Sequence, residues 1–305
     1  MLICLTLFLV STVIFLITTI LPGTAATAML GPYATPEKVK ILEVQLGLEK
    51  PVLVRYVSWL WKLVQGDWGV SLFSGEPVLD LVSRRLLPSM VIVALSIVMT
   101  VAVAIPLGVE AAVNRDRWPD LISTTVAFLG LSIPYFVWGL IFILVFALGL
   151  HLLPTSGYVD ITTDPLGGLR YAFLPSLSLT VVYVAHITRQ TRSSMIDVLT
   201  SDYIRTAKAK GLSERRILYV HALRNALLPA LTVIAIDVGY AFGGIVILEE
   251  VFAYPGIGRL AYSSIIHRDI PVIQICVIVI AAIFVIANLT ADLLYAYLNP
   301  RIRYT

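Results

Sequence analysis

The chain has 305 residues, of which 58% are hydrophobic and only 13% are charged, and its mean hydropathy is +0.90. An ordinary soluble domain contains about 25% charged residues. A soluble core therefore has no room for this much apolar surface, and a bilayer must be the solvent for much of it. The net charge of +3 is small and no compact tract of lysine and arginine occurs, which argues against nucleic acid as a partner.

Six apolar segments are long enough to cross a membrane. A hydrocarbon core about 30 Å thick requires about 20 apolar residues in a helix. The segments are residues 2–21, 87–109, 121–150, 171–188, 225–248 and 271–291. They predict an all-α polytopic membrane protein with six transmembrane helices.

The first segment has an alternative interpretation as a signal peptide, because Ala26-Thr27-Ala28 resembles a small-residue cleavage site. No lysine or arginine precedes the segment, and its apolar run is too long for the hydrophobic region of a signal peptide. We therefore expect it to remain in the protein as the first transmembrane helix.

The basic residues predict the orientation of the chain, because lysine and arginine in short loops favour the cytoplasmic side. Eight of the 22 lie in the connection between the fourth and fifth segments, Arg115 and Arg117 follow the second segment, and Arg301 and Arg303 lie near the C-terminus. In a chain with six spans all of these fall on one side. We therefore expect that side, and with it both termini, to be cytoplasmic.

The long loop over residues 22–86 is expected to contain short helices. Thr35-Pro36 is typical of a helix start, with Gly47 as the end of that helix. A second helix is expected to start at Pro51 and to carry Trp59 and Trp61, and tryptophan favours the membrane–water boundary. Two interpretations stay open: a helix packed on the outer face, or a docking surface for an external receptor.

The connection between the fourth and fifth segments predicts two short helices. Ser201 and Ser213 are the expected N-caps, and Gly211 is the expected left-handed residue between the helices. A short basic helix–turn–helix of this kind suits docking into another protein. A solvated loop that only enforces orientation is the alternative.

This connection resembles the coupling-helix motif of binding-protein-dependent ABC transporter permeases, in the peptide/nickel version of the dipeptide/oligopeptide permease B-type branch. That branch carries a Y-x-R-T-A-x-A-K-G form followed by H-A-L-R-N, with Arg205 where the general family motif has glutamate. The residues that fit are Tyr203, Arg205, Thr206, Ala207, Ala209, Lys210, Gly211, His221, Ala222, Leu223, Arg224 and Asn225. Further stretches similar to the branch are GDWGVS at 66–71, GLSIP at 130–134, LPTSGY at 153–158, EEVFAYPGIGRL at 249–260 and DLLYAYLNPRIR at 292–303.

The resemblance implies a type I ABC importer permease (MetI-like) fold. The expected organisation is a first transmembrane helix over 1–21, an extracytoplasmic loop with short helices over 22–86, and a five-helix permease core over 87–297. The core contains the cytoplasmic coupling helices at 201–228, and a cytoplasmic tail follows over 298–305. The residues expected to couple to an ATPase are Tyr203, Arg205, Thr206, Ala207, Lys210, Gly211, Leu212 and Ser213.

The resemblance also implies the partners of the chain in a bacterial or archaeal cytoplasmic membrane. They are a second homologous permease subunit, two cytoplasmic ATPase subunits, an extracytoplasmic solute-binding protein and the lipid bilayer. The chain has no G-x4-G-K-[ST] phosphate cradle, so we expect no catalytic residue, no metal site and no cofactor on it, with ATP and Mg on the partner subunits. Peptides are the favoured substrates, with nickel or another small solute as alternatives.

A stand-alone secondary transporter is the competing functional class. Such transporters have internal repeats with paired interrupted helices. The two halves of this chain show no such similarity, and the docking motif would have no purpose.

Ionisable residues at membrane depth are costly and normally face a bundle interior or a cavity. Asp237, midway along the fifth segment, is expected to face a cavity as a candidate residue of the translocation pathway, where it would attract a peptide amino group or a cation. A hydrogen bond between helices is the alternative. His186 is expected to be a hydrogen-bonded residue near the membrane boundary, and Glu249 and Glu250 are either a gate contact or the start of an ordinary loop.

Overall fold

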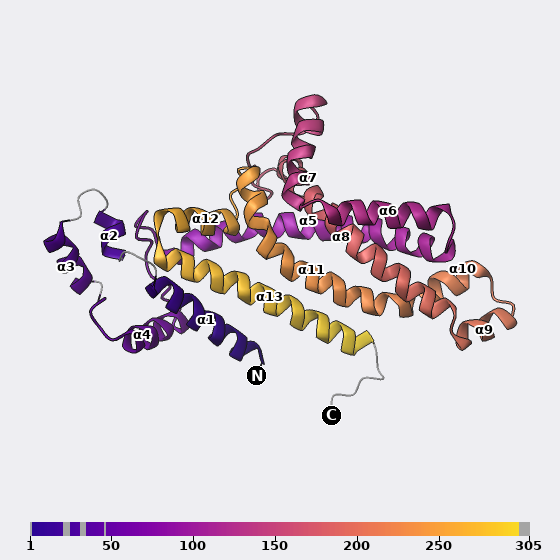
Figure 1. The fold of residues 1–305 in the computed structure, drawn as a ribbon, viewed down its shortest axis with the longest axis horizontal. Coiled ribbons are helices and arrows are strands. Elements are labelled where there is room, and N and C mark those ends of the chain that lie inside the picture. Colours follow the sequence, from indigo (N-terminus) through magenta and orange to yellow (C-terminus); the bar gives the residue numbers. More distant parts are fainter. Residues whose placement is uncertain (1, 21–24, 31–34, 46, 299–305) are drawn as a thin grey trace.

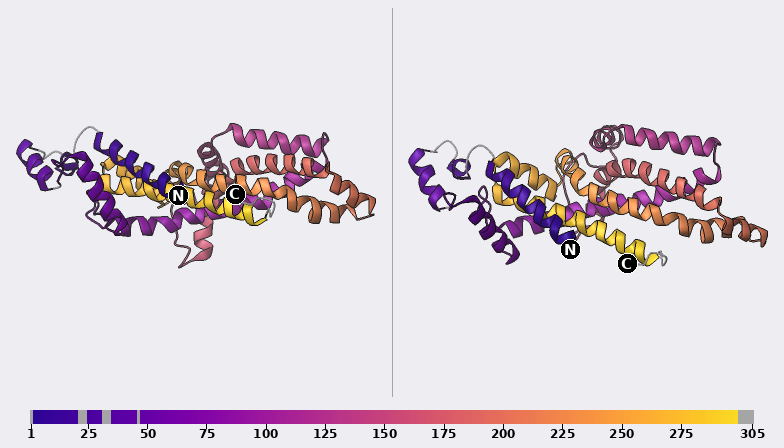
Figure 2. Two further views of the ribbon diagram at one scale, coloured as in Figure 1. Left: turned by 90° about the horizontal axis from the view of Figure 1, so that it is seen from below. Right: turned by 60° about the horizontal axis from the view of Figure 1, so that its bottom comes forward.

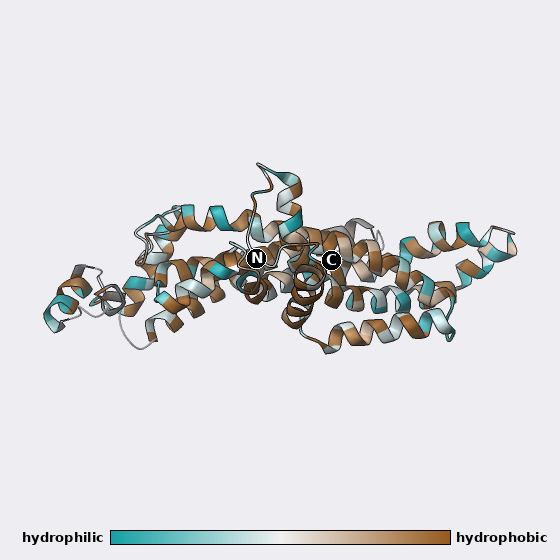
Figure 3. Ribbon diagram, turned by 90° about the horizontal axis from the view of Figure 1, so that it is seen from above, coloured by the Kyte–Doolittle hydropathy of each residue, from teal (hydrophilic) through white to brown (hydrophobic). Residues whose placement is uncertain are grey.

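The computed structural model describes residues 2–20, 25–30, 35–45 and 47–298. Most of them lie in helices, and the long helices run along one axis of an elongated molecule (Figure 1). Hydrophobic residues predominate along the middle of that axis, and hydrophilic residues are more frequent toward both ends (Figure 3). This distribution is the one expected for a bundle whose middle is solvated by lipid.

Five helices among the described residues are long and apolar enough to cross a membrane. They coincide with five of the six predicted segments, which confirms the all-α polytopic class. The helices over residues 78–113 and 165–199 extend well beyond the predicted apolar segments. Charged residues set the limits of an apolar segment, but a helix can continue through them. The five are α1 (Leu2–Ile20), α5 (Val78–Val113), α8 (Pro165–Leu199), α11 (Leu223–Val251) and α13 (Ile270–Leu298).

The third predicted segment is not one straight helix. It consists of α6 (Trp118–Ser132) and a second helix formed by α7 (Tyr135–Phe142) and a π-helical turn, η2 (Ile143–Gly149), and the two parts are bent by 98°. Ile133 is extended because it precedes Pro134, which disfavours the helical conformation at the preceding residue. If the bent pair counts as one span, the described residues contain six.

In the part of the long loop that the structure describes there are three short helices: α2 (Ala25–Leu30), α3 (Pro36–Gln45) and α4 (Val52–Val64). The predicted starts of α3 and α4 are confirmed, and the backbone N–H of Lys38 donates to the hydroxyl of Thr35. The sequence did not predict α2. Helix α5 begins at Val78, within the range expected for the loop, and its first turns carry Arg84 and Arg85 before the predicted apolar segment. The expected tail over 298–305 falls almost entirely outside the described residues.

Helices α5 and α8 pack closely along their length. Three hydroxyls of α8 donate to backbone carbonyl groups of α5: Ser176 to Ile92 at 3.0 Å, Thr180 to Ser96 at 3.3 Å and Thr188 to Ala104 at 3.3 Å. Their regular spacing keeps the same face of α8 against α5. Close approach by small residues and interhelical hydrogen bonds stabilise membrane helices that gain little from the hydrophobic effect.

A buried carboxylate fixes α12 (Ile257–His267) against α5. Glu249, at the end of α11, is fully buried and accepts a 2.5 Å hydrogen bond from the Ser89 hydroxyl. That hydroxyl accepts from the backbone N–H of Ile257, and the second carboxylate oxygen of Glu249 accepts from the backbone N–H of Arg259. Glu249 therefore compensates the unpaired N–H groups at the start of α12. Glu249 thus lies within α11 as a buried structural group and is not the start of an ordinary loop, whereas the gate contact stays a prediction.

Candidate functional site

The predicted coupling segment lies at one end of the molecule, and α3 of the long loop lies at the other (Figure 2). The coupling segment begins with α9 (Asp202–Ala209), turns at Gly211 and returns as α10 (Glu214–Arg216). A π-helical turn, η3 (Ile217–Ala222), joins α10 to α11 without a break. The second predicted helix is therefore the extension of the fifth span, which gives the segment a rigid base.

Gly211 has the left-handed conformation that the sequence predicted, with φ of +75°. Its N–H donates to the carbonyl of Lys208 at 2.9 Å, and the N–H of Leu212 donates to the carbonyl of Ala207 at 3.3 Å. This pair of bonds is the Schellman motif, which satisfies carbonyl groups at a helix C-terminus. No atom lies within 4 Å of a Cβ built at Gly211, so only its backbone conformation restricts this position.

The two predicted serine caps are wrong. The Ser201 hydroxyl donates to the carbonyl of Val198 at 2.5 Å, and neither Ser201 nor Ser213 makes a side-chain cap bond. Both residues still have the extended conformation of an N-cap, and their carbonyl groups accept the first backbone bonds of α9 and α10. The carbonyl of Val198, near the end of α8, accepts from both the hydroxyl and the backbone N–H of Ser201, so this hydroxyl completes the end of α8 rather than the start of α9.

An apolar cluster holds α9 against the ends of the long helices. Ile204 is only 1% exposed and packs with buried residues that include Met195 on α8 and Ile217 on η3. Ala207 is half-buried against the same cluster. The small side chain of Ala207 therefore packs against the chain itself, whether or not it also contacts an ATPase subunit.

A hydrogen-bond network joins the two halves of the motif. The side-chain amide of Asn225 donates to the Tyr203 hydroxyl at 2.8 Å and to the carbonyl of His221 at 3.3 Å. The Tyr203 hydroxyl also donates to the same carbonyl at 3.4 Å. Tyr203 therefore fixes α9 to the start of α11, a positioning role that the sequence alone did not indicate.

The remaining predicted coupling residues form the outer surface of the segment. Arg205, Thr206, Lys210 and Ser213 are exposed, and Leu212 is half-buried. Arg205 pairs with Asp202 at 3.4 Å, and because both side chains are almost fully exposed, this pair contributes little to stability. The surface is thus basic and largely free to contact another molecule.

Asp237 lies on the contact between α8 and α11. Its carboxylate is 3% exposed, and one oxygen lies 3.2 Å from Nδ1 of His186, whose side chain is 37% exposed. The other oxygen has no hydrogen-bond partner among the described residues. Asp237 thus makes the contact between helices that the sequence left open as the alternative, its role in a pathway stays a prediction, and His186 is hydrogen-bonded as predicted.

Residues 104–304, which include the whole coupling segment, match the family described as the binding-protein-dependent transport system inner membrane component. Residues 1–76 match the N-terminal region of the membrane components of such systems. The chain belongs to this family. It is a permease subunit of a binding-protein-dependent ABC importer, as the resemblance of its motifs indicated.

The permease is similar over nearly its full length to transport proteins of known type. It is 42% identical to a probable peptide ABC transporter permease protein of Sinorhizobium fredii, over 95% of this chain and 93% of the relative. It is 40% identical to the glutathione transport system permease protein GsiC of Escherichia coli, over 98% of this chain and 95% of that protein. The same values hold for GsiC of Shigella dysenteriae.

Proposed function

We propose that this permease forms half of the translocation pathway for small peptides and that its α9–Gly211–α10 turn docks on a cytoplasmic ATPase subunit. The observation that carries the proposal is the rigid attachment of an exposed basic turn to two long helices, α8 and α11. A turn held in this way transmits a displacement at its tip into both helices. Two membrane domains with alternative packings can be biased by such a displacement.

The geometry of the termini supports a cytoplasmic position for this turn. The N-terminal end of α1 and the C-terminal end of α13 both point toward the end of the molecule that carries α9 (Figure 1). Twelve of the 22 lysine and arginine residues belong to the short connections and the tail expected on that side, and seven of the other ten lie in the long loop, where charge has little effect on orientation. The long loop then lies on the outer side, where an extracytoplasmic solute-binding protein would dock.

The bent helix supports pairing with a second homologous permease. The α7–η2 helix projects from the side of the bundle (Figure 1). Leu140, Leu144 and Leu148 recur at intervals of four residues and are 47%, 61% and 53% exposed. They form one apolar stripe, and a second permease subunit at the same level of the membrane would cover it.

Asp237 remains a candidate pathway residue because its hydrogen-bond partner, His186, is partly exposed. The exposed edge of His186 connects the buried carboxylate to the surface of the chain. A peptide amino group approaching His186 would experience the negative charge of Asp237, since charges interact strongly in a medium of low dielectric. Nickel or another small solute would be attracted by the same pair.

Reconstitution in proteoliposomes tests the proposed function. The permease is combined with the partner permease, the two ATPase subunits and the solute-binding protein encoded with it, and uptake of labelled dipeptides, tripeptides and nickel is measured. We expect ATP-dependent peptide uptake that requires every component. Uptake by the permease alone would indicate a secondary transporter, and uptake of nickel but no peptide would overturn the proposed substrate class.

A further inference from the structure

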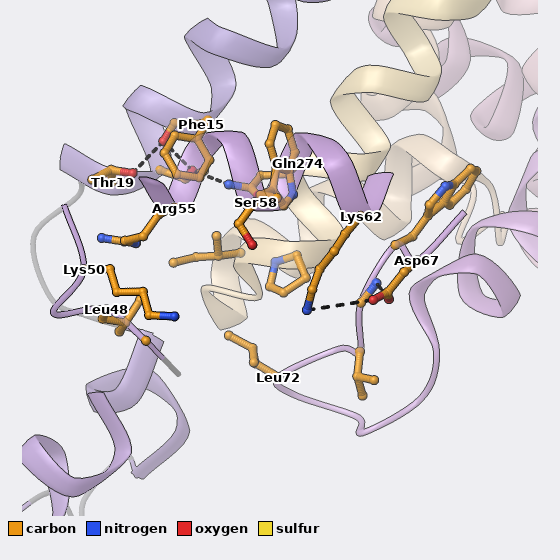
Figure 4. Close-up of a pocket in the computed structure, with 18 of the residues that line it drawn as sticks. Phe15, Thr19, Leu48, Lys50, Arg55, Ser58, Lys62, Asp67, Leu72 and Gln274 are labelled. Atoms are coloured by element: carbon orange, nitrogen blue, oxygen red, sulfur yellow. Dashed lines mark hydrogen bonds and ion pairs between the residues drawn. The ribbon is translucent and has the colours of Figure 1, made fainter. Parts of the chain in front are cut away.

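A groove of about 670 Å³ lies at the outer end of the permease, between α1, α4 and the start of α13. Lys50 and Lys62 extend into its opening from opposite sides, and Arg55 lines the same opening (Figure 4). Lys62 lies 3.9 Å from Asp67, whereas no carboxylate of the described residues pairs with Lys50 or Arg55. The groove therefore carries an uncompensated positive charge.

The depth of this groove follows from its contacts with α1. The guanidinium carbon of Arg55 lies 6.0 Å from the centre of the Phe15 ring. Phe15 is five residues before the last residue of α1, which corresponds to about 8 Å of helix. Trp59 and Trp68 also line the groove, and tryptophan favours the level of the lipid headgroups. The cationic side chains thus lie near the end of α1 and beside two tryptophans, a level that suits contact with lipid headgroups.

An exposed apolar surface of α4 adjoins the groove. It consists of Leu53, Val57 and Trp61 together with Val54 and Ser58, which also line the groove. Leu53 is 73% exposed and Trp61 is 64% exposed. A basic opening and an apolar surface therefore meet on one short helix, and a ligand that covers both must be anionic at one end and apolar at the other.

We propose that this joined site binds an anionic phospholipid of the outer leaflet, with its phosphate between Lys50 and Arg55 and an acyl chain over Leu53 and Trp61. Arginine and lysine are both common phosphate ligands. An acidic patch on a docking protein would satisfy the basic groove but would leave the apolar surface of α4 uncovered. Free phosphate would do the same. The position of this apolar surface directly beside the basic groove is what favours a lipid.

Native mass spectrometry of the full-length permease tests the proposal with phosphatidylglycerol and phosphatidylcholine of identical acyl chains. The double variant Lys50→Gln/Arg55→Gln removes the two unpaired charges, and Lys38→Gln/Lys40→Gln on α3 removes two charges outside the groove. We expect the first double variant to retain at least about tenfold less phosphatidylglycerol, since one basic residue contributes about 1 kcal/mol at an anionic surface. The α3 variant should retain as much as the unaltered protein. Equal retention by both variants, or equal retention of the two lipids by the unaltered protein, would overturn the proposal.

A second variant distinguishes a loss of lipid binding from a folding defect. Ser58→Trp places a large side chain between the basic groove and the apolar surface of α4 without changing the charge, and we expect it also to lower retention of phosphatidylglycerol. Retention at the level of the unaltered protein would show that the groove and the apolar surface do not act as one site. Full displacement of phosphatidylglycerol by millimolar inorganic phosphate would indicate a simple anion site. Unchanged lipid retention in Lys50→Gln/Arg55→Gln together with weaker docking of the solute-binding protein would assign the groove to that protein instead.

Discussion

Nδ1 of His186 on α8 lies 3.2 Å from Oδ1 of Asp237 on α11, and this contact joins two helices in the apolar part of the permease. The two residues are 51 positions apart in the chain. Both helices continue to the end that carries α9, so a displacement of the coupling turn reaches this pair through two rigid elements. The contact therefore connects the proposed coupling segment with the candidate pathway residue.

His186→Ala is expected to lower the free energy of unfolding by about 1–3 kcal/mol, because it leaves a buried carboxylate without its hydrogen-bond partner. Asp237→Asn keeps an oxygen acceptor beside His186 and should change the melting temperature less. If Asp237 acts in the pathway, Asp237→Asn should nevertheless reduce uptake at limiting substrate. Thermal melting of the purified protein and uptake in proteoliposomes are compared for each variant. Unchanged uptake by Asp237→Asn would remove Asp237 from the pathway.

Gly211→Val is expected to disturb the coupling turn without affecting membrane insertion. A left-handed backbone costs a residue with a Cβ about 1–2 kcal/mol, and more for a β-branched residue. That range corresponds to roughly a 5- to 30-fold loss of the docking-competent conformation. The measurement is substrate-stimulated ATPase activity of the reconstituted importer. Gly211→Asn is the control, because asparagine tolerates this conformation, and equal activity of both variants would contradict the role of the turn.

Ala209→Glu and Ala207→Glu are expected to fail in different ways. Ala209 is exposed, so the added carboxylate should weaken binding of the ATPase subunits and leave the melting temperature unchanged. Ala207 is half-buried against an apolar cluster, so the same substitution there should cost about 1–3 kcal/mol of stability. Copurification of the ATPase subunits and thermal melting separate the two effects. Val44→Glu, at an exposed position of α3, should alter neither quantity. ATPase binding that survives Ala209→Glu would argue against docking through this face.

Ser89→Ala is expected to loosen α12. The Ser89 hydroxyl donates to Glu249 and accepts from Ile257, and its removal leaves both buried partners incomplete. We expect a loss of about 1–3 kcal/mol in the free energy of unfolding. Hydrogen exchange of the α12 backbone should accelerate at the same time. Ser83→Ala is the matched control on α5, since Ser83 is exposed. A loss as large in Ser83→Ala would show that the effect is not specific to the buried carboxylate.

Single cysteines are expected to report the orientation of the permease after Cys4 and Cys276, both free thiols, have been replaced. A membrane-impermeant thiol reagent should label cysteines placed at Asp160 and Ser263 in intact cells. A cysteine at Glu214 should react only after the membrane has been opened. Labelling at position 214 in intact cells would reverse the proposed orientation of the coupling segment.

Many structural features of this protein could be predicted from the sequence alone, because they depend only on residues that are close together in the chain. Membrane spans follow from the apolar composition of one continuous segment, because each helix satisfies its own backbone hydrogen bonds. The left-handed turn at Gly211 follows from the absence of a Cβ, and the helix starts at Pro36 and Val52 follow from the proline and threonine that precede or open them. None of these features depends on a distant residue.

Tertiary structure decided the features that need two distant segments. Glu249 is a structural group only because Ser89, 160 residues away, lies beside it. Asp237 faces a helix because α8 brings His186 to it, and Ala207 is half-buried because the ends of α5, α8 and α11 meet beneath α9. Pro134 predicts that a helix ends, but the 98° direction of the next helix depends on the surfaces it packs against. The composition of a segment indicates whether it lies in water or in lipid. Which residues contact one another depends on how the helices pack.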